Sequence, residues 1–229
     1  KSFREEGLWA PVEAALHPGD LLLIQFGHND QKHPHLQAYN GYPENLRRFI
    51  AEIRAKKALP ILATPIARNT WTEQNGKLTY NDLLHDHAQA CIALGKELNV
   101  PVLDLHQAAM EDIIRLGRDA SKIYYHQGDW THTNDYGAVR AAGYAADALR
   151  SLGGTFPEYL PLIQAVSASI KPWKPEAALL LEKPVRLAGV KGPNGTEEGT
   201  AAQDHQAEKD GGDALARLLA AVQSARGQG

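Results

Sequence analysis

Three things are scarce in this sequence, and each scarcity argues against a class of protein. Only one cysteine, Cys91, occurs among the 229 residues, so no disulfide can form within the chain. No stretch approaches the ~20 apolar residues that span a bilayer, so a membrane protein is not predicted. The formal net charge of −3 provides no basic excess for binding nucleic acid. We therefore expect partners that are small or neutral molecules.

The length allows one sizeable domain followed by a tail. A core of about 150 to 170 residues fits one domain, and we assign it to residues 1–152, with a C-terminal extension at 153–190 and a tail at 191–229. From Lys191 to Gly212 the composition is polar and Gly-rich, which predicts a disordered linker. Residues 214–224 then carry apolar side chains at helical spacing, which predicts a short amphipathic helix.

Helical and strand-like patterns alternate over the first 152 residues. Strands are predicted at 20–26, 60–64 and 100–103, and helices at 8–16, 43–53, 80–98, 105–116 and 136–152. Residues 123–125 are compatible with either a strand or a loop. This alternation is typical of an α/β protein with three layers, α/β/α, around a mostly parallel sheet. Cys91 shares an apolar helical face with Ala88 and Ile92, so we expect it to be a buried small hydrophobe.

Polar residues gather directly after the first predicted strand. The apolar run Leu21 to Ile24 is followed by the segment Gln25 to Lys32, and in α/β folds the chemistry lies where such strands end. Gly27 permits a tight turn. Asn29 offers carboxamide N–H groups that can stabilise developing negative charge on a substrate oxygen.

Four segments give the sequence a specific resemblance. Gly19-Asp20 with Gly27-His28-Asn29-Asp30-Gln31, Ser2 to Trp9, Thr64 to Arg68, and Gly128 to Ala138 resemble the motif blocks of the SGNH (GDSL-type) hydrolases, most of all the rhamnogalacturonan acetylesterases. The resemblance runs from Lys1 to about Leu152. It implies an SGNH, flavodoxin-like fold and a serine-esterase mechanism that needs no cofactor.

The resemblance also marks an absence. In that family the nucleophilic Ser lies in a Gly-Asp-Ser segment after the first strand, whereas Gly19-Asp20 and Gly128-Asp129 are followed by Leu21 and Trp130. We therefore expect an N-terminally truncated domain without the first strand and the Ser block, with little or no esterase turnover as written. Lys1 is not a Met, so the compartment stays open.

Asp129 and His132 match the terminal block of the family, Asp followed three residues later by His. In acyl transfer, a His takes a proton from the nucleophile and returns it to the leaving alcohol, while a carboxylate orients the ring. The resemblance implies these roles for His132 and Asp129, with Asn29 as an oxyanion donor. His28, Arg68 and Trp130 are assigned to the substrate-binding surface.

Two other Asp–His pairs have the same spacing. Asp82 and His85 fall within the third predicted helix, so we interpret them as a solvated helix face. Asp30 follows Asn29 and can cap a turn, while His33 precedes a proline and is held extended. We expect structural or substrate-rim roles for Asp30 and His33.

A metal site and the role of Arg68 are the remaining questions. His28, Asp30, His33 and His35 could be ligands, but no His pair has the helical spacing common in zinc sites, so no metal is predicted. Arg68 follows a strand and could face the cleft and bind a sugar carboxylate, or it could be a surface arginine.

The predicted function is deacetylation of a pectin-type glycan or another small ester. A non-catalytic carbohydrate-binding relative is the alternative, and a metal-dependent hydrolase is a weaker one. The sequence leaves the ester substrate and the oligomeric state open.

Overall fold

The computed structural model describes residues 1–152. The extension predicted at 153–190 and the linker and helix predicted within 191–229 lie outside the described residues, so these domain boundaries stay predictions.

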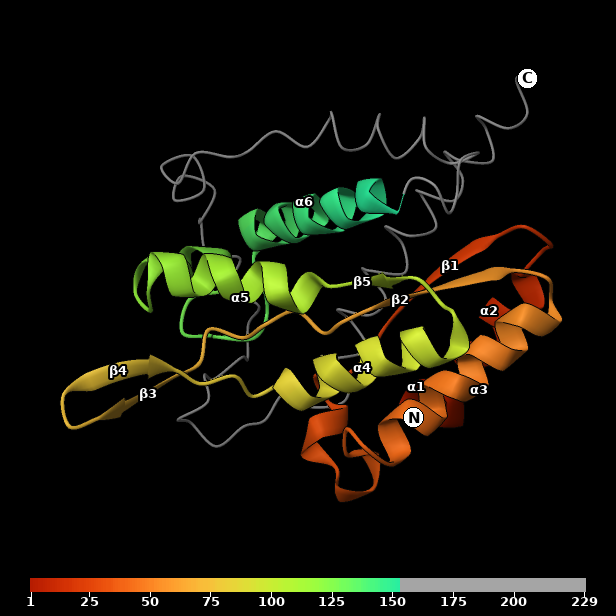
Figure 1. The fold of residues 1–229 in the computed structure, drawn as a ribbon, viewed down its shortest axis with the longest axis horizontal. Coiled ribbons are helices and arrows are strands. Elements are labelled where there is room, and N and C mark those ends of the chain that lie inside the picture. Colours follow the sequence, from red (N-terminus) through yellow and green to blue (C-terminus); the bar gives the residue numbers. More distant parts are fainter. Residues whose placement is uncertain (153–229) are drawn as a thin grey trace. The chain divides into compact units, whose positions relative to one another are not determined.

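A parallel sheet of three strands lies at the centre (Figure 1). The strands are β1 (Leu21–Gln25), β2 (Leu59–Ala63) and β5 (Val102–Leu103), in the order β1-β2-β5. β1 and β2 pair in register from Leu21↔Leu59 to Gln25↔Ala63. All three predicted strands are therefore confirmed, and their carboxyl ends meet at one edge of the sheet.

Helices connect and cover the strands. They are α1 (Ser2–Glu5), α2 (Trp9–Ala15), α3 (Gly41–Ala55), α4 (His85–Leu98), α5 (Leu105–Leu116) and α6 (Asp135–Ser151), with short 3₁₀ helices η1 (Asp30–Lys32), η2 (Pro34–Leu36) and η3 (Ala120–Tyr124). None of the helices in residues 1–152 is long and apolar enough to cross a membrane.

The two faces of β2 contact different helices, because successive side chains of a strand point to opposite sides. Leu62 packs in one core cluster with apolar residues of α2, α3 and α4. Ile61 and Ala63 pack in a second cluster with the start of α5 and the apolar face of α6. Figure 1 shows α3 and α4 on one side of β2, and α5 and α6 on the other. The predicted α/β fold with a helix-flanked parallel sheet is confirmed.

A β-hairpin occupies a region where the sequence analysis assigned no strand. β3 (Trp71–Gln74) and β4 (Lys77–Tyr80) pair antiparallel around Asn75 and Gly76, both with positive φ. An Asn-Gly turn of this kind matches the twist of a two-residue hairpin. The helix predicted from residue 80 was therefore wrong at its start: Tyr80 ends a strand, and α4 begins at His85.

The ambiguous segment 123–125 is mostly the end of η3, and Tyr125 forms an isolated antiparallel bridge with Thr133. Cys91 is 1% exposed in α4, as expected for a small hydrophobe. Burial raises the pKa of its thiol to about 12.

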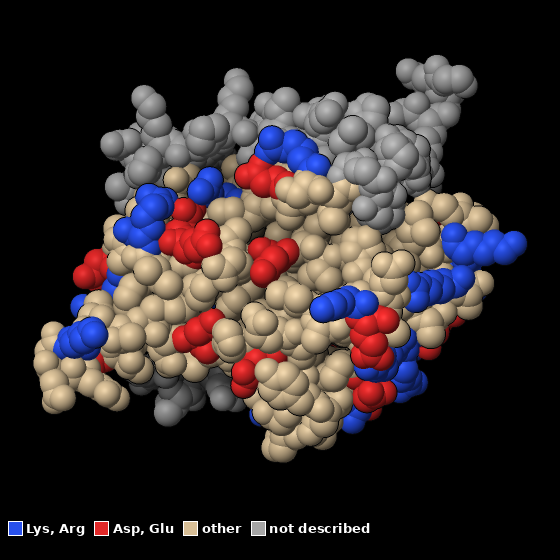
Figure 2. All heavy atoms as spheres, viewed as in Figure 1, with Lys and Arg blue, Asp and Glu red and all other residues tan. Residues whose placement is uncertain are grey.

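Charged side chains of both signs are intermixed on the face shown in Figure 2. This distribution agrees with the small net charge of −3. It gives that face no continuous basic surface of the kind that tracks a phosphate backbone.

Candidate active site

The loop after β1 turns sharply at Gly27. Its φ is +138°, and a Cβ at this position would lie 2.9 Å from Pro65 Cγ. The N–H of Gly27 donates to Asp30 Oδ2 at 3.0 Å, so Asp30 closes the turn. A side chain at residue 27 would therefore collide with Pro65, and glycine lets the loop pass close to the end of β2.

His28 points back toward the segment that follows β2. Its Nε2 lies 2.9 Å from the carbonyl oxygen of Ile66. Because a carbonyl oxygen can only accept, Nε2 carries the hydrogen in this contact. Burial and the nearby positive charge of Arg68 lower the pKa of His28 to about 4, so the ring is neutral at neutral pH.

Arg68 is a buried side chain, 6% exposed, which overturns the surface-arginine alternative. Its Nη2 donates to the carbonyl oxygen of His28 at 2.8 Å. The guanidinium also contacts the side-chain oxygen of Gln31, when that amide is oriented to satisfy both of its ends. Nε of Arg68 finds no acceptor among the described residues. Burial lowers the pKa of Arg68, and the negative charge of Asp129 acts in the opposite direction.

The segment Thr64 to Arg68 is held by side chains from several parts of the chain. Each of its five consecutive carbonyl oxygens accepts a hydrogen bond. In the order of the acceptors, the partners are Gln25 Nε2 at 3.1 Å, His106 Nδ1 at 3.1 Å, His28 Nε2 at 2.9 Å, the Tyr125 hydroxyl at 2.9 Å and the Tyr80 hydroxyl at 3.0 Å. A buried segment without ladder partners needs such donors. The segment is therefore a rigid support for the loops around it.

Asp129 and His132 form a close pair in the loop before α6. His132 Nδ1 lies 2.6 Å from Asp129 Oδ2, while Oδ1 accepts from the N–H groups of Thr131 at 2.6 Å and His132 at 3.1 Å. Burial alone would raise the pKa of Asp129, but these hydrogen bonds outweigh it and lower the pKa to about 2. Asp129 is thus ionised at neutral pH and fixes the orientation of the ring, whose side chain is 73% exposed.

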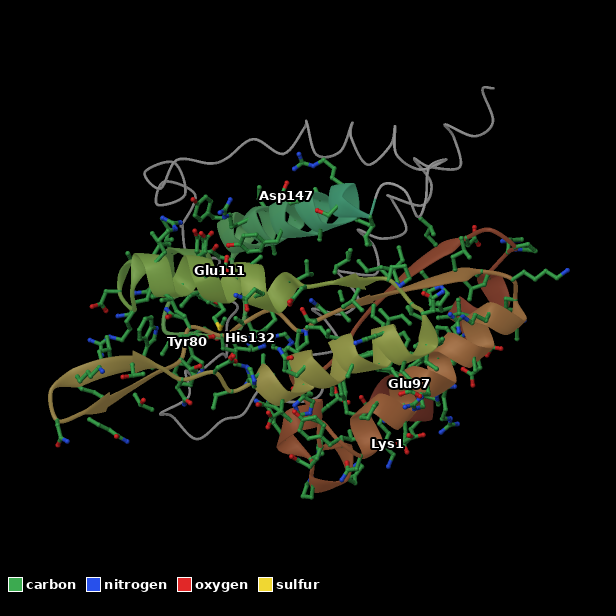
Figure 3. All side chains as sticks on the ribbon, in the orientation of Figure 1. Lys1, Tyr80, Glu97, Glu111, His132 and Asp147 are labelled. Carbon is green, nitrogen blue, oxygen red and sulfur yellow. The ribbon has the colours of Figure 1, made fainter. Side chains whose placement is uncertain are left out.

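The Asp129–His132 loop is held by backbone groups of Asn69, which follows the support segment, and of His126. The N–H of Asn69 donates to the carbonyl oxygen of Trp130 at 2.9 Å, and the N–H of His126 donates to the carbonyl oxygen of His132 at 3.1 Å. Trp130 exposes its indole at this edge. In the view of Figure 3, His132 and Tyr80 are labelled on the side of the molecule that carries the β3–β4 hairpin, away from Lys1 and Glu97.

Four of the six predicted site residues form two contacting pairs, Arg68 with His28 and Asp129 with His132. The two pairs interact electrostatically, because the charge of His132 lowers the pKa of His28 and the charge of Asp129 raises that of Arg68. Trp130 lies between Asp129 and His132 in the docked loop.

The sixth, Asn29, follows His28 directly and is exposed. Its Oδ1 accepts from Lys32 Nζ at 3.1 Å. This contact orients the carboxamide, so that its N–H groups are the end directed away from Lys32.

Asp82 was misassigned as part of a solvated helix face. It precedes α4, and its Oδ2 lies 2.9 Å from Nε2 of the buried His106 and 3.4 Å from Nδ1 of the exposed His85. Burial opposes ionisation of Asp82, but the bond to His106 outweighs it and lowers the pKa. His106 Nδ1 faces the carbonyl oxygen of Pro65, so both ring nitrogens of His106 lie against acceptor oxygens.

No sequence period could have revealed the His106–Asp82 pair, because its members come from different elements. Periodicity reports only which face of one element is apolar. The Asn75-Gly76 turn was the one available signal that Tyr80 and Asp82 lay outside the helix.

Asp30 and His33 have the structural character expected of them. Asp30 is buried and caps the turn at Gly27, while His33 is exposed with its ring 5.5 Å from that of His35. Within residues 1–152, no group of three or more His, Cys, Asp or Glu side chains is arranged to hold a metal ion.

Two serines in the described part of the chain have structural contacts. Ser121 is fully buried, and its hydroxyl contacts Asn69 Oδ1 at 3.0 Å and the carbonyl oxygen of Gly117 at 2.7 Å. The Ser151 hydroxyl donates to the carbonyl oxygen of Asp147 within α6. Ser2 is the first residue of α1.

A helix-flanked parallel sheet with an Asp–His pair in a loop beyond the strands defines an α/β protein with a candidate acid–base site. Residues 4–140 match the model of the GDSL-like lipase/acylhydrolase family, and the chain belongs to this family.

Similar proteins carry esterase names. The chain is 33% identical over 172 residues to the rhamnogalacturonan acetylesterase RhgT of Bacillus subtilis (strain 168), covering 69% of this chain and 73% of the relative. It is 30% identical over 177 residues to the probable rhamnogalacturonan acetylesterase YesY of the same organism, covering 72% and 76%. The crystal structure of YxiM from Bacillus subtilis superposes with a TM-score of 0.56 at 28% identity, covering 66% of this chain and 42% of that chain.

Proposed function

We propose that this chain carries the acid–base half of a carbohydrate O-acetyl esterase site for pectin-type glycans. The observation that carries the proposal is the 2.6 Å contact between His132 Nδ1 and Asp129 Oδ2, in a loop docked beside His28. Relatives named as rhamnogalacturonan acetylesterases support the substrate class.

In this mechanism His132 moves the proton. With Nδ1–H directed at Asp129, Nε2 carries the lone pair that takes the proton of a serine hydroxyl as its oxygen bonds to the acetyl carbon. The same nitrogen then protonates the leaving sugar hydroxyl. Water enters by the reverse sequence and releases acetate, which restores the serine. Asp129 stays ionised throughout and stabilises the imidazolium.

Asn29 is proposed as an oxyanion donor. Its Oδ1 is engaged by Lys32, so the amide N–H groups are the ones presented to solvent. Such a donor stabilises the negative charge of the tetrahedral intermediate, and removing one costs about 3–4 kcal/mol in comparable sites.

His28, Arg68 and Trp130 are proposed to form the substrate-binding surface. The exposed indole of Trp130 offers an apolar face for a sugar ring. Arg68 acts chiefly through His28, whose carbonyl oxygen it holds. Its positive charge also favours a carboxylate on the substrate beside this loop.

We further propose that the nucleophilic serine and the first strand come from residues that this sequence does not include. Ser121 is fully buried in structural contacts and is unsuited to the role. The chain as written then binds acetylated glycan with little turnover. The alternative, a non-catalytic carbohydrate-binding protein, would show the same behaviour.

Hydrolysis of p-nitrophenyl acetate tests these proposals. The chain as written should be barely above background, since losing the serine of a comparable triad costs on the order of 10⁶ in turnover. A version extended upstream by its own reading frame, including a Gly-Asp-Ser segment, should be active.

In the active form, His132→Ala should lower turnover at least about 10³-fold. The matched control is His85→Ala, because His85 lies in another Asp-x-x-His pair, is exposed, and is 3.4 Å from Asp82. Equal losses in the two variants would contradict the assignment. A cooperative melting transition in the inactive chain separates a missing nucleophile from a misfolded domain.

A further inference from the structure

A surface hollow with a volume of about 280 Å³ lies between the loop before α3 and the first turn of α4. Its walls include Gln31, Gln37, Tyr39, Asn40, Leu83 and Asp86. In Figure 1 the start of α4 lies beside the orange loop that precedes α3. The mechanism proposed above uses none of these side chains.

The hollow is built from fixed hydrogen-bonding groups. Gln37 Nε2 donates to the carbonyl oxygen of His33 at 2.9 Å, which holds the side chain and leaves its amide oxygen as an acceptor. Asn40 Oδ1 accepts from the N–H of Gly41, which leaves its amide N–H groups as donors. A donor and an acceptor on neighbouring carboxamides suit adjacent hydroxyl groups of a sugar, each of which both donates and accepts.

Tyr39 supplies an apolar face at the rim. It is 71% exposed, although most large aromatic side chains are buried. Its hydroxyl contacts Asp86 Oδ1 at 3.4 Å, which ties the ring to α4 across the hollow. Leu83, also exposed, adds apolar surface on the other side. A rigid aromatic ring beside polar groups matches a ligand with both C–H faces and hydroxyl edges.

The charge of the lining indicates a neutral ligand. Among residues 1–152, Asp86 is the acidic residue in the wall, no Lys or Arg lines the hollow, and the ring of the buried His87 is engaged with the carbonyl oxygen of Leu36. A carboxylate ligand would meet repulsion from Asp86 without a compensating cation. The volume of about 280 Å³ lies near the lower end of the range for small-molecule pockets. One sugar unit is therefore a better fit than a longer segment.

Gln31 joins the hollow to the candidate active site. With its amide oriented to satisfy both ends, its nitrogen donates to the carbonyl oxygen of Leu83 at 2.8 Å and its oxygen accepts from the guanidinium of Arg68. Arg68 in turn holds the carbonyl oxygen of His28. A glycan lying at His28 could therefore extend over Gln31 into the hollow.

We propose that this hollow, with Tyr39 as its stacking platform, binds a neutral sugar unit of the glycan chain whose acetylated unit lies at Asp129 and His132. This inference rests on the proposed function for the substrate class. It adds a specificity-determining site that recognises the polymer and leaves the ester chemistry unchanged.

Direct binding to the full 229-residue chain tests the proposal by isothermal titration calorimetry. The probes are an unacetylated oligosaccharide of alternating rhamnose and galacturonate, and tetragalacturonate, which has no neutral unit. The alternating oligosaccharide should bind, and tetragalacturonate should bind at least about tenfold more weakly. Tyr39→Ala should weaken binding of the alternating oligosaccharide about tenfold, as expected for losing one aromatic anchor. Tyr39→Phe should keep most of the affinity.

The matched control is Ile114→Ala, an exposed apolar side chain on α5, and it should bind as the parent chain does. Since Tyr39 is exposed, its replacement should leave the melting transition in place. No binding of the alternating oligosaccharide, equal binding of both probes, or unchanged affinity in Tyr39→Ala would each overturn the proposal.

The probes carry no ester, so this result is independent of turnover. If binding depends on Tyr39 but the upstream-extended form hydrolyses no acetyl ester, the esterase function is refuted and the sugar site is retained. If turnover depends on His132 but binding does not depend on Tyr39, the sugar site is refuted and the esterase function is retained.

Discussion

Replacing Gly27 by alanine should destabilise the protein more than the same change at any open glycine, because two costs combine there. At φ +138° the backbone has a conformation that residues with a Cβ rarely adopt. The added carbon would also lie 2.9 Å from Pro65 Cγ and 3.0 Å from Pro65 Cβ. A proline ring in a buried, hydrogen-bonded segment cannot rotate away.

The magnitude follows from these two costs. Backbone strain of this kind is about 1–3 kcal/mol, and overpacking by one carbon adds about 1–3 kcal/mol. Gly27→Ala should therefore lower the free energy of unfolding by about 2–6 kcal/mol. Relief of the collision would move His28 away from Ile66, so the upstream-extended form should also lose activity.

The matched control is Gly117→Ala. Gly117 also has a positive φ, +80°, but a Cβ there would meet nothing within 4 Å. It carries the backbone cost without the collision, so the two variants should differ by the overpacking alone, about 1–3 kcal/mol. Urea unfolding followed by circular dichroism measures both.

Equal destabilisation in Gly27→Ala and Gly117→Ala would refute this reasoning. It would mean that the loop after β1 can move away from Pro65 at no cost, and that the support segment does not fix the position of His28.

Three further predictions concern the charged and buried groups. Because the pKa of Asp129 is lowered to about 2, its contribution to stability is present above pH ~4 and is lost as the pH falls toward 2. Asp129→Asn should lower the free energy of unfolding by about 1–2 kcal/mol at pH 7, a value discounted because His132 is exposed. The difference in unfolding free energy between this variant and the parent chain should be smaller at pH 2 than at pH 7. His106→Phe should lower the free energy of unfolding in urea by about 2–4 kcal/mol, because it leaves Asp82 and the carbonyl oxygen of Pro65 without their partner. A loss no larger than that of His85→Ala would contradict the pairing of His106 with Asp82. Cys91, buried with its pKa raised to about 12, should react with a thiol reagent only when the chain unfolds, and rapid labelling of the native protein would show that α4 opens readily.

The elements between Leu21 and Leu116 show which parts of the fold are specified by local sequence and could therefore be predicted. Leu105–Leu116 was predicted with the bounds that the structure gives, and each strand of the parallel sheet was predicted to within two residues of its bounds. An apolar period reports directly on one element, because it fixes which of its faces is buried. The hairpin at Trp71–Tyr80 was missed because only its Asn75-Gly76 turn carried a signal, while its strands have mostly exposed side chains.

The candidate site divides in the same way. The Asp129–His132 contact joins residues three apart, so spacing and family resemblance could indicate it. Their catalytic roles, and that of Asn29, stay predictions. Arg68 could be named from the sequence, but its two suggested settings were a cleft and the surface, and burial beside His28 depended on the packing of two loops.

By itself, the sequence determined the order of the three strands of the parallel sheet and of the helices α2 to α6, the family, and the Asp–His pair before α6. Only the tertiary structure decided what surrounds Thr64 to Arg68, including the pairing of His106 with Asp82. The physical reason is that a buried backbone segment takes its hydrogen-bond donors from whichever side chains the parallel crossovers bring to it. Those donors, from Gln25 to Tyr125, share no period or spacing along the chain.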